Sequence, residues 1–277
     1  MALPSVTRTF VDGPFGQLHA RMSQPGSITA APIVCLHMSP KSGKSYRDVL
    51  PYLADNRVAL APDYPGHGES DLPPAEPEVS LEDFAACAWA VVDALAGSPV
   101  HVLGYHTGSM VAVEMAMQRP AEVNSITCIS APVFTDEEQA RLNSDYAPIP
   151  IDEDGTRFRI MWERVLQHRG PGMTLQMAAD SFAENLRAGD DYEWGHRAAF
   201  AYAATYNRNL KVIDKPVLVL NPSDDCHEQS LRSDAMLKNG RRVELPDWGH
   251  GFLSAFPAEA ARIILDFAEE TERNDRT

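Results

Sequence analysis

The stretch that decides the fold is Val102-Leu103-Gly104-Tyr105-His106-Thr107-Gly108-Ser109. Apolar residues typical of a buried strand lead into it, and an apolar segment bounded by Pro120 follows. A glycine stands two positions before His106 and another two positions after it, as a tight strand-to-helix turn requires. Histidine tolerates a positive φ angle better than branched residues do. We therefore expect the His106 side chain to project from the end of a strand.

Outward from this turn, strand-like and helix-like segments alternate. Compact apolar runs predict buried strands at 32–36, 57–60, 99–103, 123–130, 216–220 and 242–245. Helical periodicity predicts helices at 80–96, 109–118 and 257–270. Short runs at 6–10 and 17–22 predict an amino-terminal hairpin. This alternation predicts an α/β fold with a mostly parallel central sheet flanked by helices.

The stretch 134–211 breaks the alternation. It carries four helix-like segments, at 137–142, 157–167, 174–187 and 193–204, and few strand-like runs. It is far longer than an ordinary connection between strands. We predict an inserted helical lid at 134–211 and a core formed by 1–133 and 212–277.

Several motifs in fixed order resemble the α/β-hydrolase superfamily, over almost the whole chain outside the predicted lid. The turn matches the pattern G-x-nucleophile-x-G, with His106 where serine is usual. His37-Met38-Ser39-Pro40 resembles the family's HGxP segment, with methionine in place of glycine, and residues 63–70 resemble its D-x-P-G-x-G-x-S loop. The resemblance implies an α/β-hydrolase fold.

The resemblance also implies an active site. In the family, the catalytic acid follows the strand at 216–220, which favours Asp225 over Asp224, and the catalytic histidine follows the last strand, which selects His250. The oxyanion-hole positions are Ser39 and Thr107. The lid is expected to supply substrate specificity, with Trp162 and Trp194 as candidate substrate-binding residues. His37, Asp63 and His67 are expected to be architectural.

Three roles for His106 are open. It could attack a carbonyl as a nucleophile, position water or substrate while His250 acts as the base, or join His250 and Asp225 in holding a metal. We disfavour the third role and expect no metal. The leading hypothesis is a hydrolase of a small, largely apolar ester, lactone or C–C substrate. The alternatives are a lyase or proton-transfer enzyme, and a non-catalytic ligand-binding protein in which the strand-to-helix turn at His106, the nucleophile elbow of the family, is inactive.

Composition narrows the classes of partner. The formal net charge is −15 over 277 residues, which disfavours binding to nucleic acid or to anionic membrane surfaces. The four cysteines lack metal-type spacing, and no nucleotide-binding fingerprint is present, so no cofactor is expected. The chain begins without a signal-like segment, so we expect a cytoplasmic enzyme with a small-molecule substrate. Formation of a homo-oligomer is compatible with the sequence.

Overall fold

An eight-stranded sheet forms the centre of the protein. The computed structural model describes residues 2–188 and 193–274. The strand order is β1-β2-β4-β3-β5-β6-β7-β8. β1 and β2 form the predicted hairpin, β2 pairs antiparallel with β4, and every later pairing is parallel. The strands are β1 (Val6–Gly13), β2 (Gly16–Ser23), β3 (Ile33–Leu36), β4 (Ala59–Pro62), β5 (Val100–Tyr105), β6 (Val123–Ile129), β7 (Val217–Pro222) and β8 (Gly240–Leu245).

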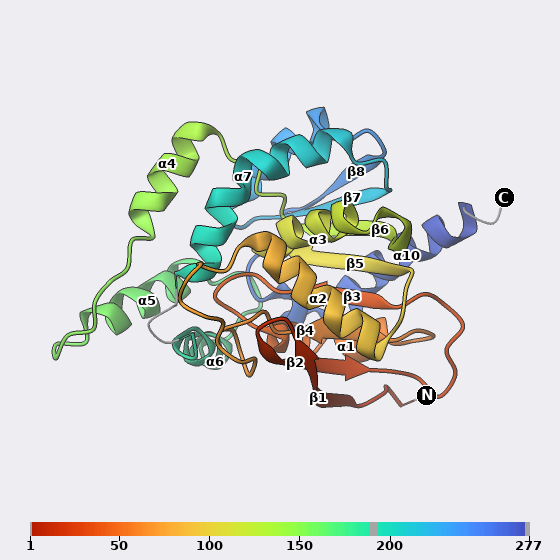
Figure 1. The fold of residues 1–277 in the computed structure, drawn as a ribbon, viewed down its shortest axis with the longest axis horizontal. Coiled ribbons are helices and arrows are strands. Elements are labelled where there is room, and N and C mark those ends of the chain that lie inside the picture. The colour runs from red at the N-terminus through yellow and green to blue at the C-terminus, as the bar shows by residue number, and fades with distance from the viewer. Residues whose placement is uncertain (1, 189–192, 275–277) are drawn as a thin grey trace.

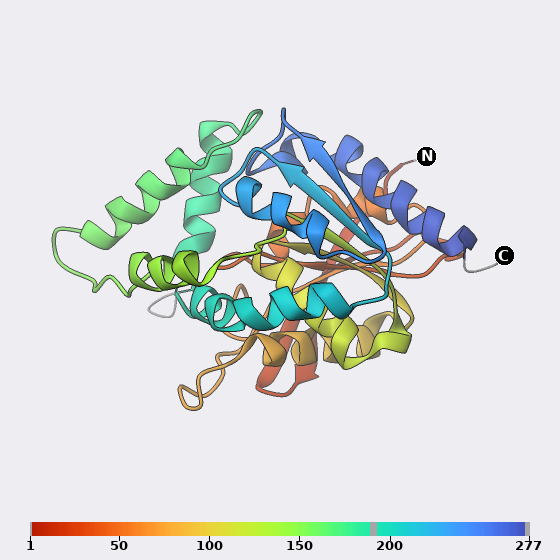
Figure 2. The same cartoon turned by 90° about the horizontal axis from the view of Figure 1, so that it is seen from above.

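Helices cover both faces of this sheet (Figure 2). On one face lie α2 (Leu81–Leu95) and α3 (Thr107–Gln118); on the other lie α1 (Leu50–Leu53), α9 (Phe252–Ala255) and α10 (Pro257–Asn274). The predicted capping box at the start of α2 is present, with Ser80 accepting from the Asp83 N–H and the Asp83 carboxylate accepting from the Ser80 N–H. The fold class predicted from the sequence is confirmed.

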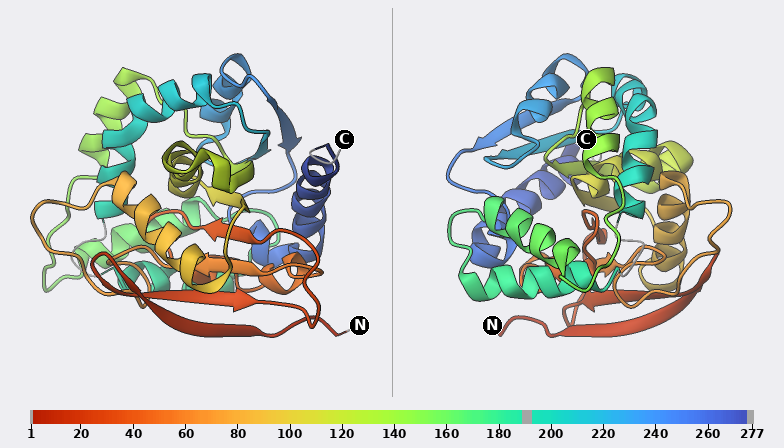
Figure 3. Two further views of the ribbon diagram at one scale, coloured as in Figure 1. Left: turned by 45° about the vertical axis from the view of Figure 1, so that its right-hand side comes forward. Right: turned by 90° about the vertical axis from the view of Figure 1, so that its left-hand side faces the viewer.

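Between β6 and β7 the described residues form four helices of ten or more residues. They are α4 (Asp136–Asp145), α5 (Thr156–Gln167), α6 (Leu175–Leu186) and α7 (Trp194–Val212). α4, α5 and α6 lie at the end of the sheet opposite the two termini (Figure 1), and the right panel of Figure 3 views this end. α7 differs from the others, because Tyr206 and Leu210 on it are fully buried in the core that α3 also joins.

The loops that could form a site follow the carboxyl ends of the parallel strands. β5, β6, β7 and β8 are parallel neighbours, so the loops that follow them emerge at the same side. α8 (His227–Leu231) begins just after the loop that follows β7. Among the described residues, no helix is long and apolar enough to cross a bilayer.

Candidate active site

The turn between β5 and α3 holds His106 in a rare backbone conformation. Its φ is 48° and its ψ is −111°, a region that costs a non-glycine residue on the order of 1–3 kcal/mol. A Cβ atom on Gly104 would lie 2.1 Å from the Gly108 carbonyl oxygen, and one on Gly108 would lie 1.9 Å from the Leu36 carbonyl oxygen. Both glycines are therefore required by close backbone packing, which aims His106 out of the sheet.

Two histidine–aspartate pairs meet at this turn. His106 Nε2 lies 2.9 Å from Asp224 Oδ2, and His250 Nε2 lies 2.6 Å from Asp225 Oδ1. The two imidazole rings are 5.1 Å apart between centroids, and His106 Nε2 is 3.8 Å from Asp225 Oδ1. The structure thus brings together His106, Asp225 and His250. His106 also has a separate carboxylate partner, Asp224.

Asp224, the second choice for the catalytic acid in the sequence analysis, is the carboxylate that pairs with His106. Its side chain is fully buried. The Ser130 hydroxyl donates to Asp224 Oδ2 at 2.6 Å, and the Cys226 N–H donates to Oδ1 at 2.9 Å. Ser130 follows β6 and has a φ of 58°, the second positive value among the described non-glycine residues. The tandem Asp224-Asp225 was the available sequence signal, whereas nothing in the sequence pointed to Ser130.

The two carboxylates set the charge of His106. Burial by itself lowers the pKa of the imidazole, but the negative charges of Asp224 and Asp225 outweigh burial and raise the pKa to about 9. Burial opposes ionisation of Asp224, yet the charge and hydrogen bond of His106 hold the pKa of Asp224 below its usual range. At neutral pH this pair is therefore an imidazolium and a carboxylate.

The same four side chains could hold a divalent cation. One ligand atom from each of His106, Asp224, Asp225 and His250 lies within 4.8 Å of the others, and two imidazoles with two carboxylates suit transition metals. The Nε2 atoms that would bind the ion are here hydrogen-bonded to the carboxylates. The ligand chemistry therefore fits an ion, while the hydrogen bonds already satisfy the buried polar atoms.

The predicted oxyanion-hole residues lie beside His106. Ser39 and Thr107 line the same cavity as the imidazole. Thr107 is the first residue of α3, where backbone N–H groups lack helical acceptors. Neither the Ser39 nor the Thr107 backbone N–H donates a hydrogen bond to any other described residue. Two N–H groups are thus available to a ligand oxygen.

The cavity at His106 has two parts. One, of about 170 Å³, extends under α4 and α7, and its apolar wall includes Met110, Pro132 and Phe200. The other, of about 120 Å³, extends toward α5 and α6 and reaches His250. Both parts include His106, Tyr146 and His196, so they adjoin.

The predicted substrate-binding tryptophans do not line either part of this cavity. Trp194 is buried in the core cluster, and Trp162 packs against Phe182 with ring centroids 5.5 Å apart. A substrate contact by either tryptophan therefore stays a prediction. Aromatic size alone could not separate side chains that pack the inserted helices from those that face the cavity. Tyr146 and Phe200 face the cavity instead.

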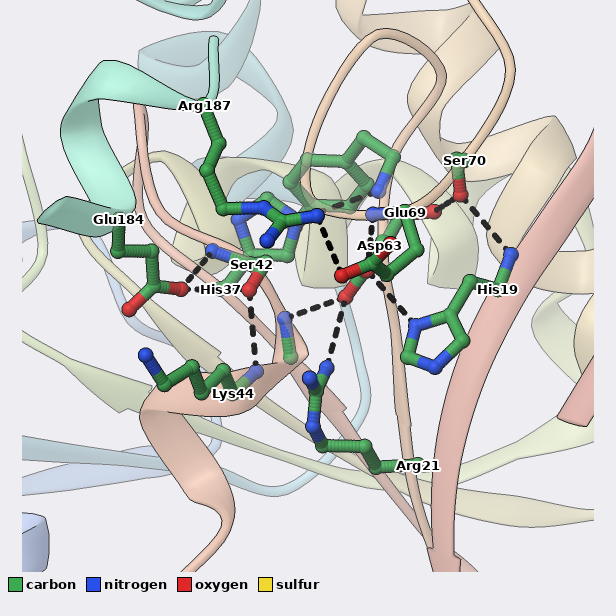
Figure 4. A network of polar contacts seen from close by, with 12 residues as sticks. His19, Arg21, His37, Ser42, Lys44, Asp63, Glu69, Ser70, Glu184 and Arg187 are labelled. Atoms are coloured by element: carbon green, nitrogen blue, oxygen red, sulfur yellow. Dashed lines mark hydrogen bonds and ion pairs between the residues drawn. The ribbon is translucent and has the colours of Figure 1, made fainter. Parts of the chain in front are cut away.

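The loops beneath the site are fixed by Asp63, as Figure 4 shows. Its carboxylate lies 2.8 Å from His19 Nδ1 and accepts hydrogen bonds from the Gly43 N–H at 2.7 Å and the Glu69 N–H at 3.0 Å. His37 Nε2 accepts from the Tyr64 N–H at 3.2 Å. These contacts agree with the architectural roles expected for Asp63 and His37.

The four cysteines are buried and unbridged.

The fold described above is that of the α/β hydrolases. The family model for the alpha/beta hydrolase fold matches residues 31–254, and the chain belongs to that family. The elbow, the acid position and the histidine position all fall inside the matched region. The class of enzyme that this family and its relatives named as hydrolases indicate is a hydrolase.

Relatives match this chain to different extents. The magnesium-chelatase 30 kDa subunit of Rhodobacter capsulatus is 31% identical over 88 residues, and the match spans only 31% of that protein and 32% of this chain. The (E)-2-((N-methylformamido)methylene)succinate hydrolase of Acinetobacter baylyi is 24% identical over 247 residues, covering 91% of that protein and 87% of this chain. An esterase from Exiguobacterium antarcticum superimposes with a TM-score of 0.77 at 17% identity, over 99% of its chain and 94% of this one, a likeness of fold alone.

Proposed function

We propose that this protein is a cofactor-free hydrolase of a small, largely apolar carbonyl compound, in which water is the nucleophile and no acyl-enzyme forms. The observation that carries the proposal is the separation of the site into two histidine–aspartate pairs facing one cavity. The cavity's modest volume and apolar wall favour a small ester, lactone or C–C substrate.

His250 is the base in this proposal. Its Nε2 is held by Asp225, which leaves Nδ1 to accept a proton from water. Tyr105 Oη lies 3.5 Å from that nitrogen, and burial keeps the pKa of this phenol well above its usual value, so Tyr105 stays neutral. As water attacks the carbonyl carbon, its proton passes to Nδ1, and Asp225 stabilises the imidazolium that results.

His106 is the acid. Its Nε2–H donates to Asp224, and Nδ1–H makes no hydrogen bond with any other described residue. The imidazolium can donate from Nδ1 to the carbonyl oxygen, beside the Ser39 and Thr107 N–H groups, and then protonate the leaving group. Direct attack by His106 is disfavoured, because a protonated imidazole has no free electron pair on nitrogen. Its raised pKa therefore suits an acid better than a nucleophile.

The test compares p-nitrophenyl esters of acetate, butyrate and hexanoate with wild-type protein, His106→Ala and His250→Ala. We expect each substitution to lower kcat/KM by about 10²–10⁴-fold, because each removes a proton-transfer group. Rapid-quench mass spectrometry is expected to find no acyl group on the protein. One oxygen from labelled water is expected in the acid product after a single turnover. His227→Ala is the matched control and should retain activity, because this half-buried ring lies against the Pro222 carbonyl and Glu244 and does not line the cavity.

Three outcomes would contradict this proposal. An acyl adduct on His106 would show direct attack, so the proposed role of this residue would be wrong. If a chelator abolishes activity and added Zn²⁺ or Mn²⁺ restores it, His106, Asp224, Asp225 and His250 would be metal ligands instead of proton-transfer groups. If wild-type protein and all variants turn over the esters equally slowly, ester hydrolysis is not the function, and the lyase and ligand-binding alternatives are favoured.

A further inference from the structure

Basic side chains gather on the wall of the cavity, although the protein as a whole is strongly acidic. Arg141 on α4 lines the part that also holds Thr107 and Phe200. Arg164 on α5 and Lys41 line the part that holds His250. The net charge of the chain is −15, so three cations on one small cavity run against the overall composition. Among the described residues that line these two parts, the acidic side chain is Asp225, which is paired with His250. Glu184 lies near Lys41 in the adjoining hollow, where it is hydrogen-bonded to Ser42.

Arg164 is the best placed of these cations. It is half-buried, and its guanidinium lies 5.0 Å from the centroid of the Tyr146 ring, which holds it in place. One nitrogen donates to the Asp145 carbonyl oxygen at 3.1 Å. Within the described ranges, no carboxylate lies within ion-pair distance of Arg164. Arg159, on the same helix, instead reaches Glu163 at 3.8 Å on the solvent side.

The charged neighbours of Arg164 do not neutralise it. Glu193 is close enough to feel the charge of Arg164, but burial raises the pKa of this carboxyl. Its ion-pair partner is the guanidinium of Arg157, at 3.8 Å. Burial, assisted by the charge of Arg164, lowers the pKa of His196 to about 3, so that imidazole is neutral. Guanidinium groups bind carboxylates in a paired geometry, and do so strongly where water is partly excluded.

Lys41 and Arg141 extend the positive surface. Lys41 Nζ donates to the Ser181 hydroxyl at 2.6 Å, to the Ser181 carbonyl at 2.8 Å and to Asn185 Oδ1. These three hydrogen bonds use its three N–H groups and fix the ammonium at the cavity wall, so Lys41 contributes positive charge there. Burial lowers the pKa of Lys41 to about 8, so most of it is charged at pH 7. Arg141 is exposed at the outer end and has no ion-pair partner within the described part of the chain.

We propose that the cavity recognises a carboxylate on the substrate, bound by Arg164 with help from Lys41 and Arg141, while the scissile carbonyl lies at His106. The inference rests on the proposed hydrolase activity and narrows its substrate class. The expected substrate has a short apolar middle section with an anionic group at one end and the reacting carbonyl at the other.

The test pairs substrates that differ in charge but match in length: the mono-p-nitrophenyl ester of glutarate and the p-nitrophenyl ester of pentanoate. We expect wild-type kcat/KM to favour the charged ester, and Arg164→Met to reduce that preference by about tenfold or more, the loss of one charge-assisted hydrogen bond. Arg164→Lys should restore part of it. Arg159→Met, on the outer side of α5, is the matched control and should leave the preference unchanged.

A second measurement does not depend on turnover. Calorimetric titration of the intact protein with succinate, glutarate and adipate should detect binding that Arg164→Met weakens about tenfold and Arg159→Met does not. Binding without ester hydrolysis would leave this inference standing while the proposed function fails. If none of the three dicarboxylates binds, or if the neutral ester is preferred and Arg164→Met has no effect, the anionic subsite is wrong.

Discussion

At the scale of single residues, the histidine in the turn is accompanied by a carboxylate placed to charge it. A histidine alone at this position would lose charge through burial, and the pKa would fall. Asp224 reverses that tendency. The charge and hydrogen bond of His106 keep the pKa of Asp224 low, and the Ser130 hydroxyl and the Cys226 N–H hold this carboxylate in position. The chemistry of the turn therefore depends on a residue 118 positions away in the sequence.

This pairing predicts a pH dependence. His106 must be protonated to act as the acid, so kcat/KM should fall as pH rises through about 9, the raised pKa of His106. Asp224→Asn removes the largest influence that raises this pKa, so the falling limb should move to lower pH by about 1–3 units. The measurement is a pH–rate profile from pH 6 to pH 10.

Asp234→Asn provides the control, because Asp234 pairs with Arg242 on the surface at 2.6 Å. Its profile should overlay the wild-type curve. If Asp224→Asn leaves the falling limb in place, His106 does not control it. If activity instead rises with pH through this range, the neutral imidazole of His106 is the active form. Direct attack by His106 on the carbonyl would then be favoured.

At the scale of elements, the inserted helices are tied to the core through α6. Glu184 accepts hydrogen bonds from Ser42, including one from its N–H at 2.9 Å, and Arg187 pairs with Glu69, as Figure 4 shows. These contacts join α6 to the loops that follow β3 and β4. Since Lys41 also bonds to Ser181 on α6, the same attachment sets one wall of the cavity.

Removing one of these attachments should loosen α6 specifically. Glu184→Ala leaves the Ser42 N–H and hydroxyl without their acceptor, at a cost of about 1–3 kcal/mol for the local contact. We expect faster hydrogen exchange in α6, with exchange in α2 unchanged, because local opening follows local contacts. Glu163→Ala, which removes an exposed pair with Arg159, is the control. Equal exchange in both variants would mean that Glu184 does not anchor α6.

The sequence predicted the elements well and the contacts between loops poorly. Strand runs such as 123–130 and helix runs such as 157–167 lie where periodicity placed them, since local patterning follows burial. His250 and Asp225 could be named because the resemblance to the α/β-hydrolase superfamily implies which loops carry the acid and the histidine. Asp224 and Ser130 could not be assigned, because which of two adjacent carboxylates turns inward depends on loop geometry. For the same reason, the sequence does not separate aromatic residues that line this cavity, such as Tyr146 and Phe200, from Trp162 and Trp194, which do not line its two parts.

At the scale of the whole molecule, ionisation of the site is linked to folding. The pKa of His106 is about 9 in the folded protein, against an ordinary histidine value of 6.5, so the folded state holds this proton more tightly. That contribution to stability is fully present below pH 6.5 and is lost as pH rises through 9. Asp224 has a lowered pKa, so its contribution is present above its usual pKa and is lost in acid.

The free energy of unfolding should therefore decline between pH 6.5 and pH 9, by up to about 3 kcal/mol at 1.36 kcal/mol per pKa unit. Urea titrations at successive pH values measure it. His106→Asn cannot titrate and should show a much flatter dependence. Repulsion within a chain of net charge −15 would also grow with pH, but 0.5 M salt screens exposed charges far more than a buried pair. A decline that salt abolishes, or that His106→Asn shares, would locate its cause on the surface instead of at His106 and Asp224.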